Sequence, residues 1–164
     1  MNTFVDASLE VSMDLFPDSK ELLELFIANE VKFMVVGGHA LGAHGLPRAT
    51  EDFDLWVWPD PLNAERIITC LAQFGFEHSG LSDKDFTEPD TVVQLGFTPT
   101  RIDLMTSISG VEFEDAWERR IIATLDGVEF PVIGKADLVA NKWALGRPQD
   151  LVDLMKLVRQ AQRE

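Results

Sequence analysis

The segment Asp52-Phe53-Asp54-Leu55-Trp56-Val57-Trp58 constrains the fold of this chain most, because it alternates carboxylates with large apolar residues. A period of two residues predicts a β-strand, which Pro59 ends. The two aspartates and Trp56 share one face of that strand, and Phe53, Leu55 and Val57 point to the opposite face. A buried carboxylate costs free energy unless it is paired or bound to a cation, so the acidic face of this strand requires a partner.

A third aspartate, Asp103, lies in a second apolar segment, Arg101-Ile102-Asp103-Leu104-Met105. Asp52 and Asp54 emerge from one strand face about 7 Å apart at their Cα atoms, and Asp103 could project from a neighbouring strand toward the same point. Three oxygen ligands from adjacent strands suit Mg²⁺, which keeps several waters and takes further ligands from phosphates. The sequence therefore predicts a Mg²⁺ site held by Asp52, Asp54 and Asp103.

Upstream of this strand, Val35-Val36-Gly37-Gly38-His39-Ala40 ends an apolar run in two glycines and enters a helix. Glycines permit close backbone approach to an anion, and a helix N-terminus offers free N–H donors and a positive dipole end. A phosphate cradle one strand away from a carboxylate cluster can hold a metal-chelated triphosphate. Two metals there would stabilise the attacking and leaving oxygens of a displacement at phosphorus.

The order of these features resembles the nucleotidyltransferase superfamily typified by DNA polymerase β. That family combines Gly-Gly or Gly-Ser after an apolar residue, about a dozen residues, and then Asp-x-Asp flanked by apolar residues. Here Val36-Gly37-Gly38 is followed by 13 residues and then Asp52-Phe53-Asp54-Leu55. Phosphatases of the haloacid-dehalogenase type and many glycosyltransferases also use Asp-x-Asp, but in those proteins the apolar strand precedes the pair.

The resemblance extends to the C-terminus, where Lys135 to Lys142 and Gly146 to Leu154 look like the closing helices of small bacterial nucleotidyltransferase-like proteins. Those include relatives of the abortive-infection toxin group and stand near the antibiotic nucleotidyltransferases. The resemblance implies Mg²⁺-dependent transfer of a nucleoside monophosphate from a triphosphate to an acceptor hydroxyl, with release of pyrophosphate. Asp52 and Asp54 would hold the metals, and Asp103 would complete one metal site and help to deprotonate the acceptor.

Five residues are candidates for nucleotide binding: Gly37, Gly38, His39, Thr50 and Lys142. Thr50 shares the strand face of the aspartates, and Lys142 lies in the resembling C-terminal segment. Two have a structural alternative: His39 as a local hydrogen-bonding residue and Thr50 as part of the loop-to-strand transition. Lys135, seven residues before Lys142 and nearly on the same helical face, could also neutralise triphosphate charge, but it is interpreted as a solvated residue of the first turn. Trp56 could stack on a base, although tryptophans are mostly core residues. Arg147, Asp150 and Asp153 are interpreted as a structural ion network.

The remaining pattern predicts an α/β (α+β) fold, with a mixed β-sheet, flanking helices and two C-terminal helices. We expect residues 1–164 to form a single nucleotidyltransferase-like domain. The expected helices are Lys20 to Asn29 with Asp18 as N-cap, Pro61 to Phe74, Lys135 to Leu145 and Pro148 to Gln160. The expected strands are Phe33 to Val36, Asp52 to Trp58, Thr91 to Phe97, Arg101 to Thr106, Ile121 to Leu125 and Val128 to Ile133, with a surface loop over Leu81 to Pro89.

The charge balance limits the partners. With 14 Lys+Arg against 28 Asp+Glu, the net charge is −14, which ranks nucleic acid last among acceptors, behind a small molecule or a protein, and disfavours membrane binding. Residues Met1 to Glu10 contain no basic or apolar signal-peptide region, and no apolar run approaches the ~20 residues of a membrane helix, so a cytoplasmic protein is expected.

The chain has no obvious large acceptor-binding domain, so the acceptor surface would come from the Leu81–Pro89 loop or from a second subunit in a homodimer. The alternative function is a non-catalytic partner-binding module with this fold, for example a toxin–antitoxin component. A third interpretation, a Mg²⁺-dependent phosphohydrolase, lacks a recognisable path for a nucleophilic water.

Overall fold

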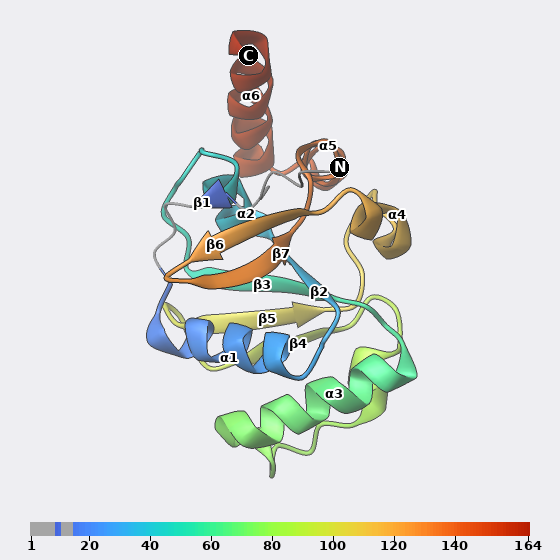
Figure 1. The fold of residues 1–164 in the computed structure, drawn as a ribbon. Helices are drawn as coiled ribbons and strands as arrows, with labels where there is room; N and C mark the ends of the chain where they lie inside the picture. Colours follow the sequence, from blue (N-terminus) through green and yellow to red (C-terminus); the bar gives the residue numbers. More distant parts are fainter. Residues whose placement is uncertain (1–8, 11–14) are drawn as a thin grey trace, which may run out of the picture.

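A computed structural model describes residues 9–10 and 15–164, and it shows a seven-stranded mixed sheet in the order β1-β6-β7-β2-β3-β5-β4 (Figure 1). The expected fold class is confirmed. Most of the N-terminal segment that bears on a signal peptide lies outside the described residues. The strands are β1 Leu9–Glu10, β2 Phe33–Val36, β3 Asp52–Val57, β4 Val92–Leu95, β5 Arg101–Met105, β6 Ile121–Leu125 and β7 Val128–Val132.

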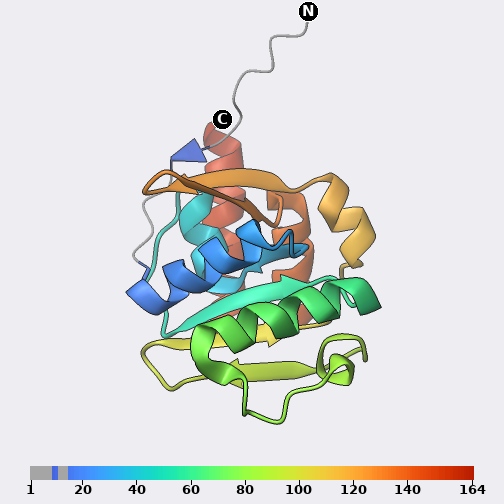
Figure 2. The same ribbon diagram turned by 60° about the horizontal axis from the view of Figure 1, so that its bottom comes forward.

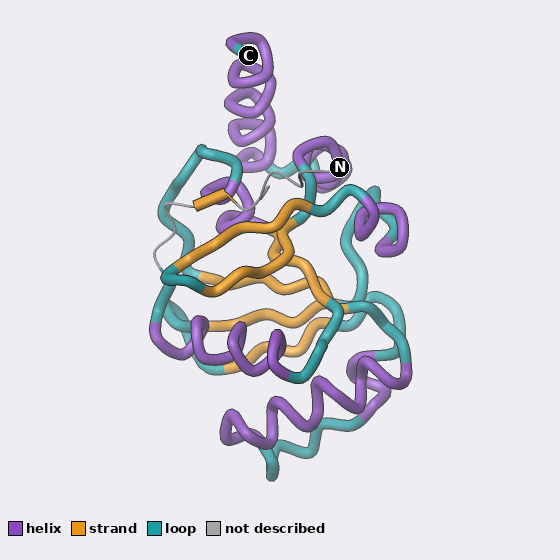
Figure 3. The backbone as a smooth tube through the Cα atoms, viewed as in Figure 1, coloured by secondary structure: helices purple, strands orange, loops and turns teal. Residues whose placement is uncertain are grey.

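Within the described ranges, six α-helices connect and cover these strands (Figure 3). They are α1 Pro17–Ala28, α2 Gly37–Ala43, α3 Pro61–Leu71, α4 Phe113–Glu118, α5 Lys135–Leu145 and α6 Pro148–Arg163. Figure 2 shows α1 and α3 side by side in front of the strands, with α5 and α6 behind them. No helix in the described ranges combines the length and the apolar character that crossing a membrane requires.

The two glycines and the aspartates come together through the central strand pairs. β2 is antiparallel to β3, with Val36 opposite Asp54, and β3 is parallel to β5. The four residues of β2 are all buried, and Leu55 and Val57 of β3 are fully buried against the helical layer. Burying each such side chain contributes roughly 1.5–3 kcal/mol, so the core fixes the strand register that the site depends on.

Several expected boundaries are wrong. Helix α1 begins at Pro17, with Phe16 as N-cap and no side-chain cap, and Asp18 lies in the first turn instead of capping it. Proline at the first helical position starts the helix because its missing N–H is not needed there. Helix α3 ends at Leu71, because a π-helical turn over Ala72–Phe76 follows it and Gly75 adopts φ 110°.

The expected loop over Leu81 to Pro89 contains a 3₁₀ helix, η2 Asp83–Phe86, in which Phe86 is fully buried. This turn anchors the loop against the core. Helix α4 and strand β1 were not expected. The hairpin turn Asp126-Gly127 agrees with the prediction, because both residues have positive φ (50° and 78°), as a type I′ turn requires.

Candidate active site

The parallel pairing of β3 with β5 brings the three predicted carboxylates together. Asp54 lies opposite Asp103 and Asp52 lies opposite Arg101, so all four side chains leave the same face of the sheet. One carboxylate oxygen from each of Asp52, Asp54 and Asp103 lies within 4.8 Å of the others. In the described part of the chain this is the one group of acidic, histidine or cysteine residues arranged to hold a metal ion.

Arg101 is part of this cluster, although it was not among the predicted site residues. Its Nη2 lies 2.9 Å from Asp52 Oδ2, and its Nε lies 3.0 Å from Asp103 Oδ1. The signal was present in the sequence, because Arg101 precedes Asp103 by two residues and therefore shares its strand face. One guanidinium thus neutralises part of the charge of two carboxylates.

Asp54 is the carboxylate of the cluster that most resists ionisation. Burial, and then the charges of Asp103 and Asp52, raise the pKa of Asp54 to about 7. Burial also raises the pKa of Asp103, although Arg101 opposes the shift. Groups this close titrate together, so the cluster as a whole resists full ionisation. A divalent cation would relieve the repulsion, and the three carboxylates fit a Mg²⁺ ion in number, ligand type and spacing.

Gly37 is required where α2 begins. Its φ is 70°, and a Cβ built there would lie 2.3 Å from Asp54 Oδ2. Gly38 packs closely in another direction, since a Cβ on it would lie 3.0 Å from Cβ of Thr50. The first glycine therefore leaves room for the Asp54 carboxylate, and the second accommodates the chain that enters β3.

A pocket of about 330 Å³ opens over the carboxylates. It is bordered by Val36, Gly37, Asp52, Asp54, Arg101, Asp103, Met105, Ser107, Ile108, Ser109, Asn141, Lys142, Leu145 and Arg147. Of the five predicted nucleotide-binding residues, Gly37 and Lys142 line this pocket. Ser107, Ser109 and Asn141 were missed, because no local pattern distinguishes them from ordinary polar residues.

Gly38, His39 and Thr50 are not among the residues that line the pocket. The ring of His39 packs edge-on against Phe53, with 5.0 Å between centroids, and Phe53 belongs to the opposite face of β3 from the aspartates. The hydroxyl of Thr50 donates a hydrogen bond to the carbonyl oxygen of Asp52 at 3.3 Å. These contacts correspond to the structural alternatives for both residues.

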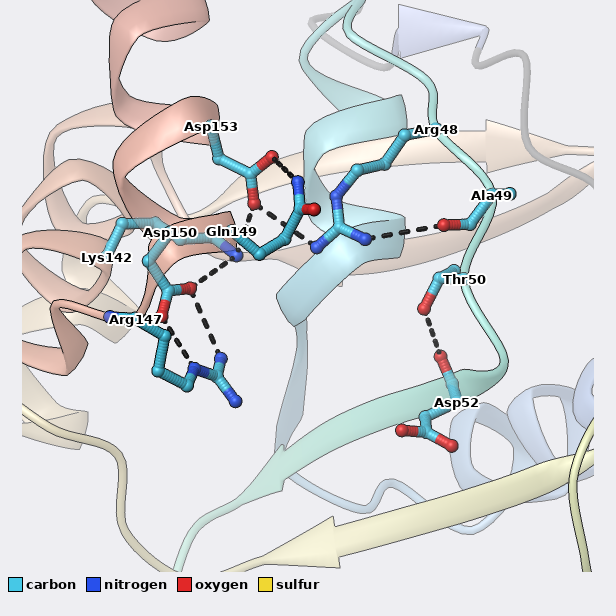
Figure 4. Close-up of polar contacts among 9 residues, drawn as sticks. All are labelled: Arg48, Ala49, Thr50, Asp52, Lys142, Arg147, Gln149, Asp150 and Asp153. Atoms are coloured by element: carbon cyan, nitrogen blue, oxygen red, sulfur yellow. Dashed lines mark hydrogen bonds and ion pairs between the residues drawn. The ribbon is translucent and has the colours of Figure 1, made fainter.

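Lys142 is buried at the edge of this pocket and is 2% exposed. Its Nζ lies 3.3 Å from Asp150 Oδ1 and 3.0 Å from Asp153 Oδ2. Arg147 also pairs with Asp150 at 2.6 Å, and Arg48 pairs with Asp153 at 3.2 Å (Figure 4). The interpretation of a network around Arg147 and Asp150 agrees with these contacts, but Asp153 pairs with Lys142 and Arg48.

The two buried aspartates of this network are ionised. Burial alone would raise the pKa of Asp150, but hydrogen bonds from Arg147 and Lys142 outweigh it and lower the pKa. The pKa of Asp153 is lowered in the same way, with hydrogen bonds from Lys142 and Gln149 overcoming burial. Three cationic side chains therefore surround two carboxylates, which leaves surplus positive charge at this wall of the pocket.

The two walls of the pocket therefore differ in charge. The β3–β5 wall carries three carboxylates and one guanidinium, and the α5–α6 wall carries the surplus cation. A metal-chelated polyphosphate has the complementary polarity, because the metal suits the carboxylates and the phosphate oxygens suit Lys142 and Arg147. The pKa of Asp54 responds to Lys142 as well, which places the two walls within electrostatic reach.

The expectation that tryptophans are core residues is confirmed for Trp56 and wrong for Trp143. Trp56 is 1% exposed, because its ring packs against Phe113 and its Nε1 donates to the carbonyl oxygen of Thr106, so it is not accessible to stack on a base. Trp143, in contrast, is 74% exposed on α5 rather than in the core.

A larger hollow of about 470 Å³ lies beyond the other end of β3, around Trp58 and Trp117. The ammonium of Lys32 lies 4.5 Å and 4.8 Å from the centroids of these two rings. This hollow is not where the three carboxylates converge, so size alone does not identify the reactive site. The smaller, charged pocket is the candidate active site.

Comparisons with known proteins bear on the family and the fold. Residues 13–160 match the model of a family described as "Nucleotidyltransferase of unknown function (DUF6036)". The crystal structure of a "putative nucleotidyltransferase" from Thermotoga maritima is similar with a TM-score of 0.58 and 16% sequence identity, over 91% of this chain and 98% of that one. At that identity the likeness shows a shared fold. Among curated proteins, no match was found.

Proposed function

Because the chain belongs to this nucleotidyltransferase family, we propose that it transfers a nucleoside monophosphate from a nucleoside triphosphate to an acceptor hydroxyl, with Mg²⁺ as cofactor and pyrophosphate as the second product. The observation that carries the proposal is the convergence of Asp52, Asp54 and Asp103 within 4.8 Å beside Gly37. The family and fold support a nucleotidyltransferase in general. The metal, the substrates and the roles below are the finer part of the proposal.

Asp52, Asp54 and Asp103 would hold Mg²⁺, which when bound would neutralise the charge that develops on the phosphoryl oxygens. The acceptor oxygen forms a bond to the α-phosphorus while the bond from that phosphorus to the bridging oxygen of pyrophosphate breaks. Asp103 accepts the proton of the acceptor hydroxyl. Its neighbour Arg101 positions this carboxylate through the contact at 3.0 Å.

The opposite wall would bind the phosphates that leave. Lys142 and Arg147 line the pocket, and their partners Asp150 and Asp153 hold them in place. A cation that is already fixed in position loses little side-chain entropy when the triphosphate binds. The acidic chain favours a small molecule or a protein as acceptor over nucleic acid, in a cytoplasmic setting.

The test is calorimetric titration of each of the four nucleoside triphosphates into the protein, with and without Mg²⁺. Wild type, Asp52→Asn and Asp54→Asn are compared, and Asp83→Asn, at an exposed position, is the matched control. We expect Mg²⁺-dependent binding of at least one nucleotide by wild type and the control, and its loss in both site variants. Binding that survives in Asp54→Asn would contradict the assignment of this carboxylate.

One observation favours the alternative, a partner-binding module without catalysis. Arg101 already pairs with Asp52 and Asp103, so the carboxylates are partly neutralised without a metal. The same titration separates the two functions. Folded wild type that binds no Mg²⁺–nucleotide would favour the module, including a toxin–antitoxin component, and the search would move to a protein partner.

A further inference from the structure

The hollow of about 470 Å³ around Trp58 and Trp117 has no part in the proposed reaction. Trp58 follows the end of β3, whereas Asp54 lies four residues earlier, which is about 13 Å along a strand. The hollow and the carboxylate pocket have no lining residue in common. Its volume lies in the range of small-molecule sites, which is roughly 300–1,000 Å³, so we considered it as a separate site.

Three half-buried basic residues border this hollow: Lys32, Arg66 and Arg120. Within the described ranges, which include every lysine and arginine of the chain, no carboxylate lies within 4.0 Å of these three side chains. Every other basic residue that is not exposed does have such a partner, and these residues are Lys20, Arg48, Arg101, Lys135 and Lys142. The half-buried cations that lack a carboxylate partner are therefore gathered in one place.

Neutral groups hold these three cations in place. The ammonium of Lys32 lies 4.5 Å and 4.8 Å from the ring centroids of Trp58 and Trp117. The guanidinium of Arg120 lies 3.9 Å from the centroid of Trp117, and its Nη1 donates to the carbonyl oxygen of that residue at 2.6 Å. Nη1 of Arg66 donates to a backbone carbonyl in the turn after α1, at 3.1 Å. A ring or a carbonyl fixes a cation without cancelling its charge, and each guanidinium keeps most of its five N–H donors.

Carboxylates near the hollow are engaged elsewhere or exposed to water. Oδ2 of Asp60 accepts hydrogen bonds from two backbone N–H groups at the start of α3, at 3.0 Å and 3.2 Å. Oε1 of Glu114 accepts a hydrogen bond from Nε1 of Trp58 at 3.1 Å. Glu30 and Glu129 border the hollow with exposed side chains, whose charges water and salt screen. These four carboxylates therefore leave the donors of the three cations open to a ligand.

The rest of the lining is largely apolar. Ile27 and Leu62, which are 40% and 54% exposed, border the hollow together with Ile122 and Pro131. A ligand that covers these side chains removes apolar surface from water, which is favourable in proportion to the area covered. The hollow thus combines an apolar lining with fixed cations, and the complementary ligand has an apolar body and a negatively charged group.

We propose that this hollow is a second ligand site, which binds an organic anion: a carboxylate or a phosphate monoester on an apolar ring or chain. Lys32, Arg66 and Arg120 bind the anionic oxygens, because a planar guanidinium matches either group with two parallel N–H donors. The body of the ligand lies against Ile27 and Leu62. Cations that are already fixed lose little side-chain entropy on binding. The site does not depend on the proposed transferase function, since it rests on other residues.

The test uses four probes with one apolar body: naphthoate, naphthyl phosphate, naphthylmethylammonium and naphthalenemethanol. Each is titrated into ¹⁵N-labelled wild type without nucleotide or Mg²⁺, and the indole N–H signals are followed by NMR. Trp58→Phe and Trp117→Phe assign the two signals at the hollow. We expect both anions to shift these two signals and to bind more tightly than the ammonium and the alcohol. The signal of Trp143, which is 74% exposed on α5, is the internal control and should not move.

The same titration on two variants tests the role of the cations. Arg120→Gln should weaken binding of the anions by about tenfold or more, because it removes charge-assisted hydrogen bonds. Lys84→Gln, at an exposed position on η2, is the matched control and should bind as wild type does. Tighter binding of naphthoate would identify a carboxylate as the ligand, and tighter binding of naphthyl phosphate a phosphate ester. Absence of binding, binding of the ammonium or the alcohol as tightly as the anions, or an unchanged affinity in Arg120→Gln would overturn the proposal.

Discussion

Replacing Gly37 by alanine tests the link between the glycine turn and the metal ligands. The new Cβ would lie 2.3 Å from Asp54 Oδ2, 3.2 Å from its Cγ and 3.3 Å from its Cβ. To restore van der Waals separation, the Oδ2 atom must move by about 1 Å, and the Cγ and Cβ atoms must each give by a few tenths of an ångström. Alanine at φ 70° also costs about 1–2 kcal/mol of stability, whatever its surroundings.

Gly80→Ala separates the two effects. Gly80 has φ 78°, and a Cβ there would meet nothing within 4 Å, so this variant has the backbone cost without the clash. We expect both variants to lose about 1–2 kcal/mol in urea denaturation. A displacement of about 1 Å at a reacting group can cost on the order of 10²-fold, so Gly37→Ala should lose Mg²⁺–nucleotide affinity by about that factor in calorimetry. The control should bind as wild type does.

The reasoning would be refuted by a Gly37→Ala protein that binds Mg²⁺–nucleotide within a few-fold of wild type. Equal losses of affinity in Gly37→Ala and Gly80→Ala would also refute it, because the effect would then follow stability and not the position of Asp54. If neither protein binds, Mg²⁺ alone can be titrated, and its affinity should fall in Gly37→Ala and stay constant in Gly80→Ala.

Three further predictions concern the charged groups. The pKa of Asp54 is about 7 in the folded, metal-free protein and about 3.9 in an unfolded chain, so the native state holds the extra proton between these values and stability should fall as pH rises from 4 to 7. Urea denaturation at pH 5 and pH 8 gives the difference in the free energy of unfolding between the two pH values, and Asp54→Asn should reduce that difference. An unchanged difference would exclude Asp54 as its source. Lys142→Met leaves two buried carboxylates with one cation fewer and should destabilise the fold by about 3–5 kcal/mol in chemical denaturation. Lys135→Met, which breaks a partly exposed pair with Glu164, should cost under about 1 kcal/mol, and equal losses would mean that burial of the network contributes nothing. Arg101→Gln removes the cation between two site carboxylates, so Mg²⁺ should raise its thermal midpoint by more than it raises that of wild type; a smaller increase would show that Arg101 mainly positions ligands for the metal.

The parts of the fold that the sequence predicted are those in which a local pattern has one structural solution. The alternation in Asp52–Val57 defines a strand because only a period of two separates carboxylates from apolar residues. Lys135–Leu145 has the predicted boundaries, since Gly146 with φ 63° ends it. Helix α4 was missed because Phe113–Glu118 is six residues long, too short to show helical periodicity.

The carboxylate half of the candidate site could be predicted for a related reason. Asp52 and Asp54 share a strand, and Asp103 lies in the neighbouring apolar segment, so a single strand pairing brings all three together. The expected places of His39 and Thr50 depended instead on how the chain turns after Gly38. That turn is determined by packing against Phe53 and by the Thr50 hydrogen bond, which the sequence does not display.

The cationic half of the site could be predicted only in part. Arg147 and Asp150 are three residues apart and were expected to pair. Arg48 meets Asp153 across 105 residues, and Lys142 meets Asp153 only after α5 and α6 have packed together, which no local pattern displays. A surface lysine pairs with aspartate for under about 1 kcal/mol, whereas Lys142 is buried with two aspartates whose burial is unfavourable without it. The fold therefore holds the ammonium of Lys142 at the pocket edge through Asp150 and Asp153, without a bound phosphate. That arrangement would let Lys142 serve both as a structural residue and as the proposed phosphate ligand, and replacing it should affect stability before it affects binding.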